Sequence, residues 1–290
     1  MYVTSLIAQA GMLDAKLVEN LRNAWGGGIV EWLAPDEAAE FQLEVRPSNF
    51  DKVWTDLQAM EVDLALQYSK NRRKKLLIAD MDSTMIAQEC IDELADVAGV
   101  GEDVREITRR AMNGEFDFSQ ALRERVVLMK DVAETTIETV LSERISYVLG
   151  GETLIATMKA AGAYTALVSG GFTAFSQTVA ETLGFDEHRA NRLIIEEGRL
   201  TGAVEDPILG REAKVEALED LTQKLSLRDE DVIAVGDGAN DLGMLGRAGT
   251  GVALHAKPAV QAECDVRVNH GDLTALLFLQ GYSRDEFCGL

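Results

Sequence analysis

The sequence predicts an α/β protein whose larger part is a doubly wound parallel sheet, preceded by a smaller α+β unit. Three continuous apolar runs, at 75–84, 163–172 and 231–241, end abruptly in small or acidic residues. Runs without alternation are typical of strands buried on both faces, as in a parallel sheet. Helical patterns separate the runs, which favours crossover connections with helices packed on the sheet.

Residues 1–70 are expected to form the smaller unit, in the order strand, helix, strand, strand, helix, strand. Large apolar residues recur every four positions from Leu13 to Trp25, which indicates one face of a helix. Pro35 separates two strand-like runs, as in a hairpin. This βαββαβ order is that of the ferredoxin-like fold, which serves several functions, so the ligand of this unit is not predicted.

The second domain is predicted to span 75–290, after a basic run at 70–75 that we interpret as a solvated linker. About 75 residues of mainly helical pattern separate the first two buried runs, although a crossover needs only about a dozen. The excess predicts a helical cap at about 88–148. Because ligands of doubly wound sheets bind beyond the carboxyl ends of the strands, we expect the site there, beneath the cap.

Composition limits the classes of partner. The 49 acidic residues outnumber the 28 basic ones and give a formal net charge of -21, so the mean field repels nucleic acids and anionic membranes. No apolar run approaches a membrane span, and the three cysteines form no CxxC motif. We therefore expect a cytoplasmic protein with neither a nucleic-acid nor a membrane partner, whereas its oligomeric state is not predicted.

Two acidic clusters follow two of the predicted strands. Asp80 and Asp82 end the first run, and Asp237 and Asp241 end the third. In an extended chain, side chains at positions i and i+2 point the same way, so the first pair is expected to face one site. Each cluster alone also fits a turn. Two clusters at one edge of a sheet are better explained as a hard-oxygen site suited to Mg²⁺.

The second run and the helical segment after it add groups that suit an anion. Ser169 and Gly170 offer a hydroxyl and exposed backbone N–H groups, which together can cradle a phosphate, although a plain turn fits these residues equally well. Lys214 lies in a helical pattern before the third run. Taken by itself, it is most simply interpreted as a surface lysine.

Together these motifs resemble those of the haloacid dehalogenase superfamily, from residue 75 to about 280. Residues 80–84 fit the DxDx[TV] signature, Ser169 and Lys214 fit the second and third motifs, and 236–241 fits the fourth. Within that superfamily the chain most resembles the phosphoserine phosphatase family. Four segments outside the motifs extend this resemblance: 88–95, 111–126, 190–202 and 255–260.

The resemblance implies that O-phosphoserine is hydrolysed to serine and phosphate, the last step of serine biosynthesis. It implies Asp80 as the nucleophile that becomes an aspartyl-phosphate, and Asp82 as the general acid and base. It also implies Mg²⁺ bound by Asp80, Asp237 and the backbone carbonyl of Asp82. The implied ligands of the phosphoryl group are Ser169, Gly170 and Lys214, and Asn240 and Asp241 complete the shell around the metal. The implied ligands of the amino acid are Glu89 for the ammonium and Arg125 for the carboxylate, with Phe118 closing over them.

Two alternatives stay open. One is a related phosphatase of another small phosphate ester, and the other is a non-catalytic amino-acid sensor that uses residues 1–70. The intact Asp80 and Asp82 argue against the sensor. Judged without the resemblance, Arg125 is more simply a solvated helix residue, and Phe118 is as simply part of the cap core.

Overall fold

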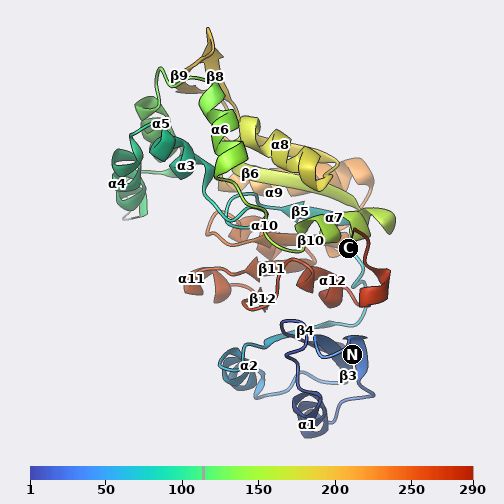
Figure 1. Cartoon of the computed structure of the whole chain (residues 1–290). Helices are drawn as coiled ribbons and strands as arrows, with labels where there is room; N and C mark the ends of the chain where they lie inside the picture. Colours follow the sequence, from blue (N-terminus) through green and yellow to red (C-terminus); the bar gives the residue numbers. More distant parts are fainter. Residues whose placement is uncertain (113–114, 290) are drawn as a thin grey trace.

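The computed structural model describes residues 1–112 and 115–289. A small antiparallel sheet lies at one side of a larger parallel sheet, and a group of helices stands over one end of the larger sheet (Figure 1). Within the described ranges, no helix has the length and apolar character needed to cross a membrane.

The larger sheet has six parallel strands in the order β12-β11-β10-β5-β6-β7. Its three central strands are the predicted apolar runs, and all residues of β5 and β10 are buried because helices cover both faces. This confirms the doubly wound core. The strands are β5 (Leu76–Ala79), β6 (Tyr164–Phe172), β7 (Glu187–Asn191), β10 (Val232–Gly236), β11 (Thr250–Leu254) and β12 (Val266–Val268).

Alternating side chains of the central strands enter two separate apolar cores. Leu77 and Ala79 face one core, whereas Leu76 and Ile78 face the other. Helices α7 (Gly151–Ala160), α8 (Thr173–Leu183) and α12 (Ala275–Leu279) cover the first face, and α9 (Arg211–Leu225) and α10 (Leu242–Arg247) cover the second. Three short elements complete the domain: η1 (Asp229–Asp231), α11 (Pro258–Gln261) and η2 (Arg284–Glu286).

The predicted helical insertion stands above the carboxyl ends of the strands (Figure 1). Its entry and exit segments pair through a bridge between Ile86 and Tyr147 and a hydrogen bond of 3.0 Å from Val148 N–H to the Met85 carbonyl. Part of the predicted helical segment, residues 113–114, lies outside the described residues. The helices are α3 (Cys90–Val97), α4 (Gly101–Met112), α5 (Phe118–Leu128) and α6 (Thr135–Glu143).

A hairpin that the sequence pattern does not predict joins the sheet domain to the cap. It consists of β8 (Leu193–Glu196) and β9 (Arg199–Val204). Leu200 exchanges backbone hydrogen bonds with cap residues, accepting from Asp131 N–H at 2.8 Å and donating to the Val132 carbonyl at 2.9 Å. The cap is therefore tethered by this hairpin as well as by its two connecting segments.

The N-terminal unit follows the predicted element order and forms a four-stranded antiparallel sheet in the order β2-β3-β1-β4. Two helices cover one of its faces. Its assignment to the ferredoxin-like class, and the boundaries of both domains, stay predictions. The elements are β1 (Tyr2–Ile7), α1 (Ala15–Trp25), β2 (Glu31–Ala34), β3 (Ala38–Leu43), α2 (Phe50–Gln58) and β4 (Asp63–Tyr68).

The basic run between the units is not a solvated linker, so that interpretation is wrong. Arg72 donates to both carboxylate oxygens of Glu40, at 2.8 and 2.5 Å, and to the Leu279 carbonyl at 3.2 Å. The ammonium of the buried Lys74 donates to the Glu230 carbonyl at 2.8 Å. Sequence alone could not reveal these acceptors, because they come from three distant segments of the chain.

Candidate active site

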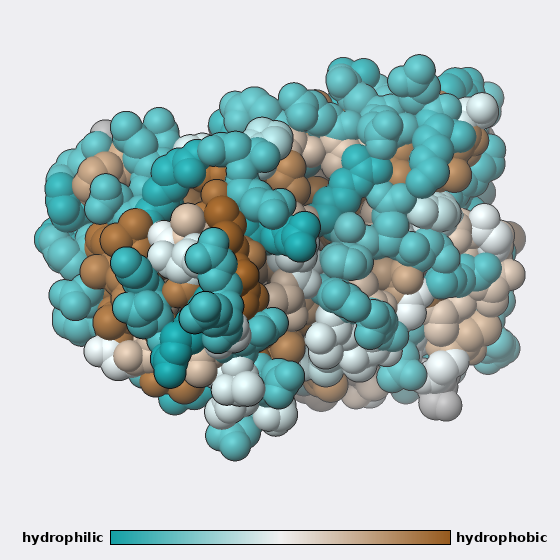
Figure 2. Space-filling model, turned by 90° about the horizontal axis from the view of Figure 1, so that it is seen from above, coloured by the Kyte–Doolittle hydropathy of each residue, from teal (hydrophilic) through white to brown (hydrophobic). Residues whose placement is uncertain are grey.

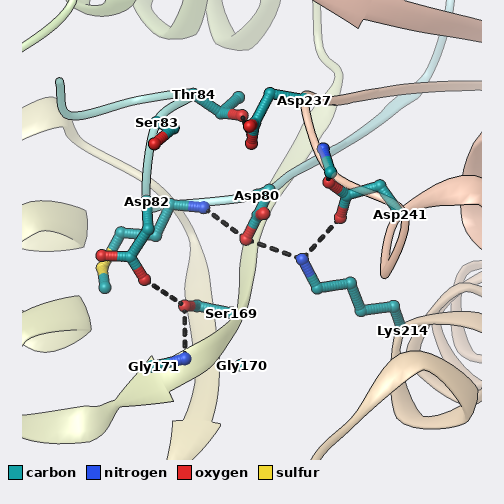
Figure 3. A network of polar contacts seen from close by, with 12 residues as sticks. Asp80, Asp82, Ser83, Thr84, Ser169, Gly170, Gly171, Lys214, Asp237 and Asp241 are labelled. Atoms are coloured by element: carbon teal, nitrogen blue, oxygen red, sulfur yellow. Dashed lines mark hydrogen bonds and ion pairs between the residues drawn. The ribbon is translucent and has the colours of Figure 1, made fainter. Parts of the chain in front are cut away.

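The site begins at the carboxyl end of β5, where the chain changes from apolar to acidic. Asp80 is buried and keeps the strand ladder, since its N–H donates to the Val235 carbonyl at 3.0 Å. Its Oδ1 atom accepts from Met81 N–H at 2.7 Å and lies 2.6 Å from Lys214 Nζ (Figure 3). The first predicted carboxylate is therefore held rigidly and is paired with a cation.

Lys214, on α9, is 2 % exposed, so its interpretation as a surface lysine is wrong. Its ammonium lies between two carboxylates, 2.6 Å from Asp80 and 2.6 Å from Asp241 (Figure 3). Burial acts to lower the pKa of Lys214, but the two carboxylates outweigh it and raise this pKa above its usual value. The lysine is thus a permanent buried cation.

An extended chain would make the Asp82 and Asp80 side chains point the same way, but in the structure they do not. After Asp80 the backbone forms a tight turn, with Met85 N–H donating to the Met81 carbonyl at 2.9 Å and Ser83 at a φ of 54°. The Asp82 carboxylate consequently accepts from Cys90 N–H at 2.9 Å and from Ser169 Oγ at 3.3 Å (Figure 3). Its place is on the cap side of Asp80.

The pKa of Asp82 is raised to about 7, chiefly by burial and then by the charges of Glu89 and Asp80. Near neutral pH its carboxyl group can therefore exist in both protonation states. A group with that property can donate a proton and take one back, which is what general acid and base catalysis requires.

Asp80, Asp237 and Asp241 form a group that can hold a metal ion, since they offer oxygen atoms that all lie within 4.8 Å of one another. Burial first, and then the charge of Asp80, raises the pKa of Asp237 to about 6 and that of Asp241 to about 7. Three crowded carboxylates, two of them paired with Lys214, fit a hard cation. The Asp82 side chain is outside this group, which leaves its backbone carbonyl as the predicted ligand.

The end of β6 brings a hydroxyl and two glycines against these carboxylates. Ser169 Oγ accepts from Gly171 N–H at 2.8 Å while donating to Asp82 (Figure 3). A Cβ atom on Gly171 would lie 2.8 Å from Asp82 Oδ2, so any other residue there would displace the Asp82 carboxylate. Asn191, at the end of β7, donates to the Gly170 carbonyl at 2.8 Å. This bond holds residues 169–171, the predicted phosphate cradle, in place.

The cap contributes the remaining predicted residues. Glu89 accepts from Ser83 Oγ at 2.8 Å, and burial raises its pKa. Arg125 is half-buried, with Nε donating to the Ala121 carbonyl at 3.2 Å, so it is not a solvated helix residue. Phe118 reaches down to the cradle, because a Cβ atom on Gly170 would meet its ring at 3.1 Å.

Two residues with evident structural roles are not singled out by the sequence analysis. Thr84 Oγ1 donates to Asp237 Oδ1 at 3.4 Å, and Asn191 donates to the Gly170 carbonyl. Thr84 lies inside the DxDx[TV] signature and Asn191 inside a segment that extends the resemblance, so signals existed for both. Asn240, which was predicted, lies half-buried beside these residues, its Oδ1 close to Gly238.

Seen from above, the most apolar side chains gather at the cap end of the molecule, whereas the rest of this face mixes hydrophilic, intermediate and a few apolar ones (Figure 2). Val127 is 57% exposed and Phe118 is 37% exposed, both on α5. Because the Phe118 ring also touches the cradle, part of this apolar surface borders the site.

The fold and the site together define a capped, doubly wound α/β domain with a carboxylate, a lysine and a metal-compatible acidic group at the carboxyl edge of its sheet. The chain belongs to the haloacid dehalogenase-like hydrolase family, whose model matches residues 77–246. The family resemblance and the predicted doubly wound α/β class of the larger domain are thereby confirmed.

Individual relatives point in the same direction. A phosphoserine phosphatase from Haemophilus influenzae is 44% identical over 234 residues, which are 80% of this chain and 73% of that protein. A haloacid dehalogenase family hydrolase from Salmonella enterica superposes with a TM-score of 0.88 at 28% identity, covering 99% of this chain and 100% of the other. A substrate-bound phosphoserine phosphatase has a TM-score of 0.66 at 42% identity, covering 71% of this chain and 97% of the other.

Proposed function

We propose that this protein is a Mg²⁺-dependent phosphatase that hydrolyses O-phosphoserine to serine and phosphate, the last step of serine biosynthesis. The observation that carries the proposal is the buried Asp80 carboxylate, 2.6 Å from Lys214 and beneath a cap that presents Glu89 and Arg125. The activity named for the relatives supports it. We also propose a cytoplasmic location, where the three free cysteines would stay reduced.

The reaction would proceed in two displacements at phosphorus. A carboxylate oxygen of Asp80 forms a bond to phosphorus as the bond from phosphorus to the serine oxygen breaks, and Asp82 gives that oxygen its proton. Water then attacks the aspartyl-phosphate, Asp82 takes a proton from the water, and phosphate leaves with Asp80 restored. The raised pKa of Asp82, about 7, suits both proton transfers near neutral pH.

Binding of the phosphoryl group would fall to Ser169, Gly170 and Lys214, the hydroxyl, backbone N–H and ammonium donors that converge near Asp80 (Figure 3). Mg²⁺ would be held by Asp80, Asp237 and the Asp82 carbonyl, with Asp241 and Asn240 around it. When bound, the cation supplies positive charge that offsets repulsion between the carboxylate and the phosphate dianion.

Recognition of the amino acid would depend on the cap. Glu89 carries a negative charge for the substrate ammonium, Arg125 a positive charge for the substrate carboxylate, and Phe118 packs across the cradle. Opposite charges placed in this way suit a zwitterionic phosphate ester better than a neutral sugar phosphate. The pairing explains why a small cap rather than the sheet would set specificity.

A phosphate-release assay over phosphoserine, phosphothreonine and several sugar phosphates, each with and without Mg²⁺, tests this proposal. We expect phosphoserine to be the preferred substrate and turnover to need the cation. Equal or faster release from a sugar phosphate would favour a phosphatase of another small ester. No release from any ester would favour a non-catalytic amino-acid sensor.

A further inference from the structure

We propose that Lys257 is a substrate-attracting residue at the mouth of the site, and that Asp63 of the N-terminal unit positions it through two loops of the sheet domain. Lys257 belongs to the segment 255–260, which carries none of the roles assigned above. The inference rests on the proposed function for the identity of the substrate, a phosphate ester with a carboxylate. The residue pair itself follows from contacts.

Lys257 is brought to the site by its strand. β11 pairs with β10 in parallel, with Gly236 opposite Ala253, so the loops that follow the two strands leave the same edge of the sheet side by side. The first of these loops begins with Asp237, and the second carries Lys257 immediately before α11. In Figure 1, α11 lies at the left end of the larger sheet, and the cap helices α3 and α4 lie above it in the view.

The side chain of Lys257 is exposed, on the loop that leaves the sheet beside the loop of Asp237. Within residues 1–112 and 115–289, no carboxylate oxygen lies within 4.0 Å of its ammonium. Lys214, in contrast, is already engaged by Asp80 and Asp241, so Lys257 is the better placed of the two to meet an arriving anion.

The loop before Lys257 is fixed by its backbone and by one imidazole. His255 adopts a φ of 45°, a conformation that costs energy for a residue other than glycine. Its N–H donates to the Val268 carbonyl at 2.8 Å, and its Nε2 donates to the Gly271 carbonyl at 2.8 Å. The position of Lys257 therefore depends on the loop 269–271, which follows β12.

That second loop is held in turn by the N-terminal unit. Asp63, the first residue of β4, is 2% exposed and accepts three backbone N–H groups, from Asn269 at 2.8 Å, His270 at 3.0 Å and Gly271 at 2.8 Å. Burying a carboxylate is costly unless its oxygens are satisfied, and here one loop supplies the donors. Gly271 joins the two halves of the connection, because its N–H faces Asp63 and its carbonyl faces His255.

The expected effect of this arrangement is on substrate capture. The chain has a formal net charge of -21, and its site gathers five carboxylates, so an approaching phosphate dianion is repelled until it meets local positive charge. In this proposal, Lys257 meets the substrate at the mouth of the site and is not one of the groups that contact the reacting atoms. It would therefore favour the bound substrate and the transition state alike, which lowers KM and leaves kcat nearly unchanged.

Steady-state kinetics with phosphoserine test the role of Lys257. We expect Lys257→Ala to raise KM by about fivefold with kcat within about twofold of the wild-type value, and the difference in KM to shrink as salt is added. Lys257→Arg keeps the charge and should restore KM. An unchanged KM in Lys257→Ala, or no recovery in Lys257→Arg, would overturn the assignment.

A double-mutant cycle tests the role of Asp63. Asp63→Ala should raise KM in the wild-type background but not in the Lys257→Ala background, since the effect is transmitted through Lys257. Glu37→Ala is the matched control. It removes the ion pair of the N-terminal unit with Arg284 but does not touch the loop 269–271, and we expect its KM to be unchanged. Equal effects of Asp63→Ala in both backgrounds would overturn the connection.

Failure of this inference can be told apart from failure of the proposed function. If the wild-type protein releases no phosphate from phosphoserine, the proposed function fails, and the same variants are compared with another ester that the protein does hydrolyse. If the wild-type protein hydrolyses phosphoserine and the Lys257 variants match it, only the inference fails. Melting temperatures of all variants show whether a raised KM reflects partial unfolding.

Discussion

At the scale of single residues, three carboxylates near one lysine acquire different chemical properties from their partners. Asp80 lies 2.6 Å from Lys214, which keeps a positive charge beside it. Asp82 faces the cap instead, where burial and the charges of Glu89 and Asp80 raise its pKa to about 7. Asp241 lies on the other side of Lys214, at 2.6 Å. Position rather than residue type thus separates a candidate nucleophile from a candidate proton donor.

Replacing Asp80 tests the covalent route directly. Asp80→Asn keeps the size of the side chain but removes the anionic oxygen, so we expect turnover to fall by at least about a thousandfold. The fold should persist, because the amide oxygen can still accept from Met81 N–H and Lys214 keeps Asp241. Activity is measured by phosphate release and folding by circular dichroism. Near-normal turnover in a folded variant would exclude the aspartyl-phosphate.

At the scale of elements, the cap places residues of helices α3 and α5 opposite the sheet. Its two connecting segments are paired to each other, and the β8–β9 hairpin binds the loop between α5 and α6. Arg125 and Phe118 are both on α5, so one helix carries a charge toward the substrate and an aromatic ring against the cradle. A substitution on this helix should therefore change selectivity more than chemistry.

Arg125→Ala tests that separation. We expect kcat/KM for phosphoserine to fall by about a hundredfold, since a charge-assisted contact with the substrate carboxylate is lost. For phosphoethanolamine, which has no carboxylate, the fall should be less than about threefold. Parallel assays on the two esters give the ratio, with Arg123→Ala, an exposed residue of the same helix paired with Asp206, as the control. Equal losses on both esters would count against the contact.

The elements also show how far sequence can predict this molecule. The buried strands and the cap helices can be predicted because each has its own apolar pattern within a short stretch of sequence. Asp80, Asp237 and Ser169 can be predicted because each lies at the end of a buried strand. The β8–β9 hairpin was missed because its strands are short and only partly buried. The burial of Lys214 and Arg72 depends on acceptors far away in the chain, so patterns of neighbouring residues could not predict it.

At the scale of the whole molecule, the site should cost stability when no cation is bound. The pKa values of Asp82 and Asp241, about 7, and of Asp237, about 6, exceed the usual value of 3.8. Between about pH 4 and pH 7 the folded protein therefore binds protons that the unfolded chain has lost. The free energy of unfolding must then fall as pH rises through this window. The reason is that ionising these buried carboxyl groups costs more in the folded protein, where they repel one another, than in the unfolded chain.

A divalent cation should reverse that loss, which makes the site measurable without an activity assay. In EDTA, we expect the contribution of these groups to the free energy of unfolding to fall by about 6 kcal/mol between about pH 5 and pH 8. Mg²⁺ binds ionised carboxylates, so it should raise the melting temperature more at about pH 8 than at about pH 5. Asp237→Asn should be more stable than the wild type in EDTA at the higher pH and should lose most of the Mg²⁺ effect. An equal Mg²⁺ effect at both pH values, or in both proteins, would contradict a metal site built on Asp237.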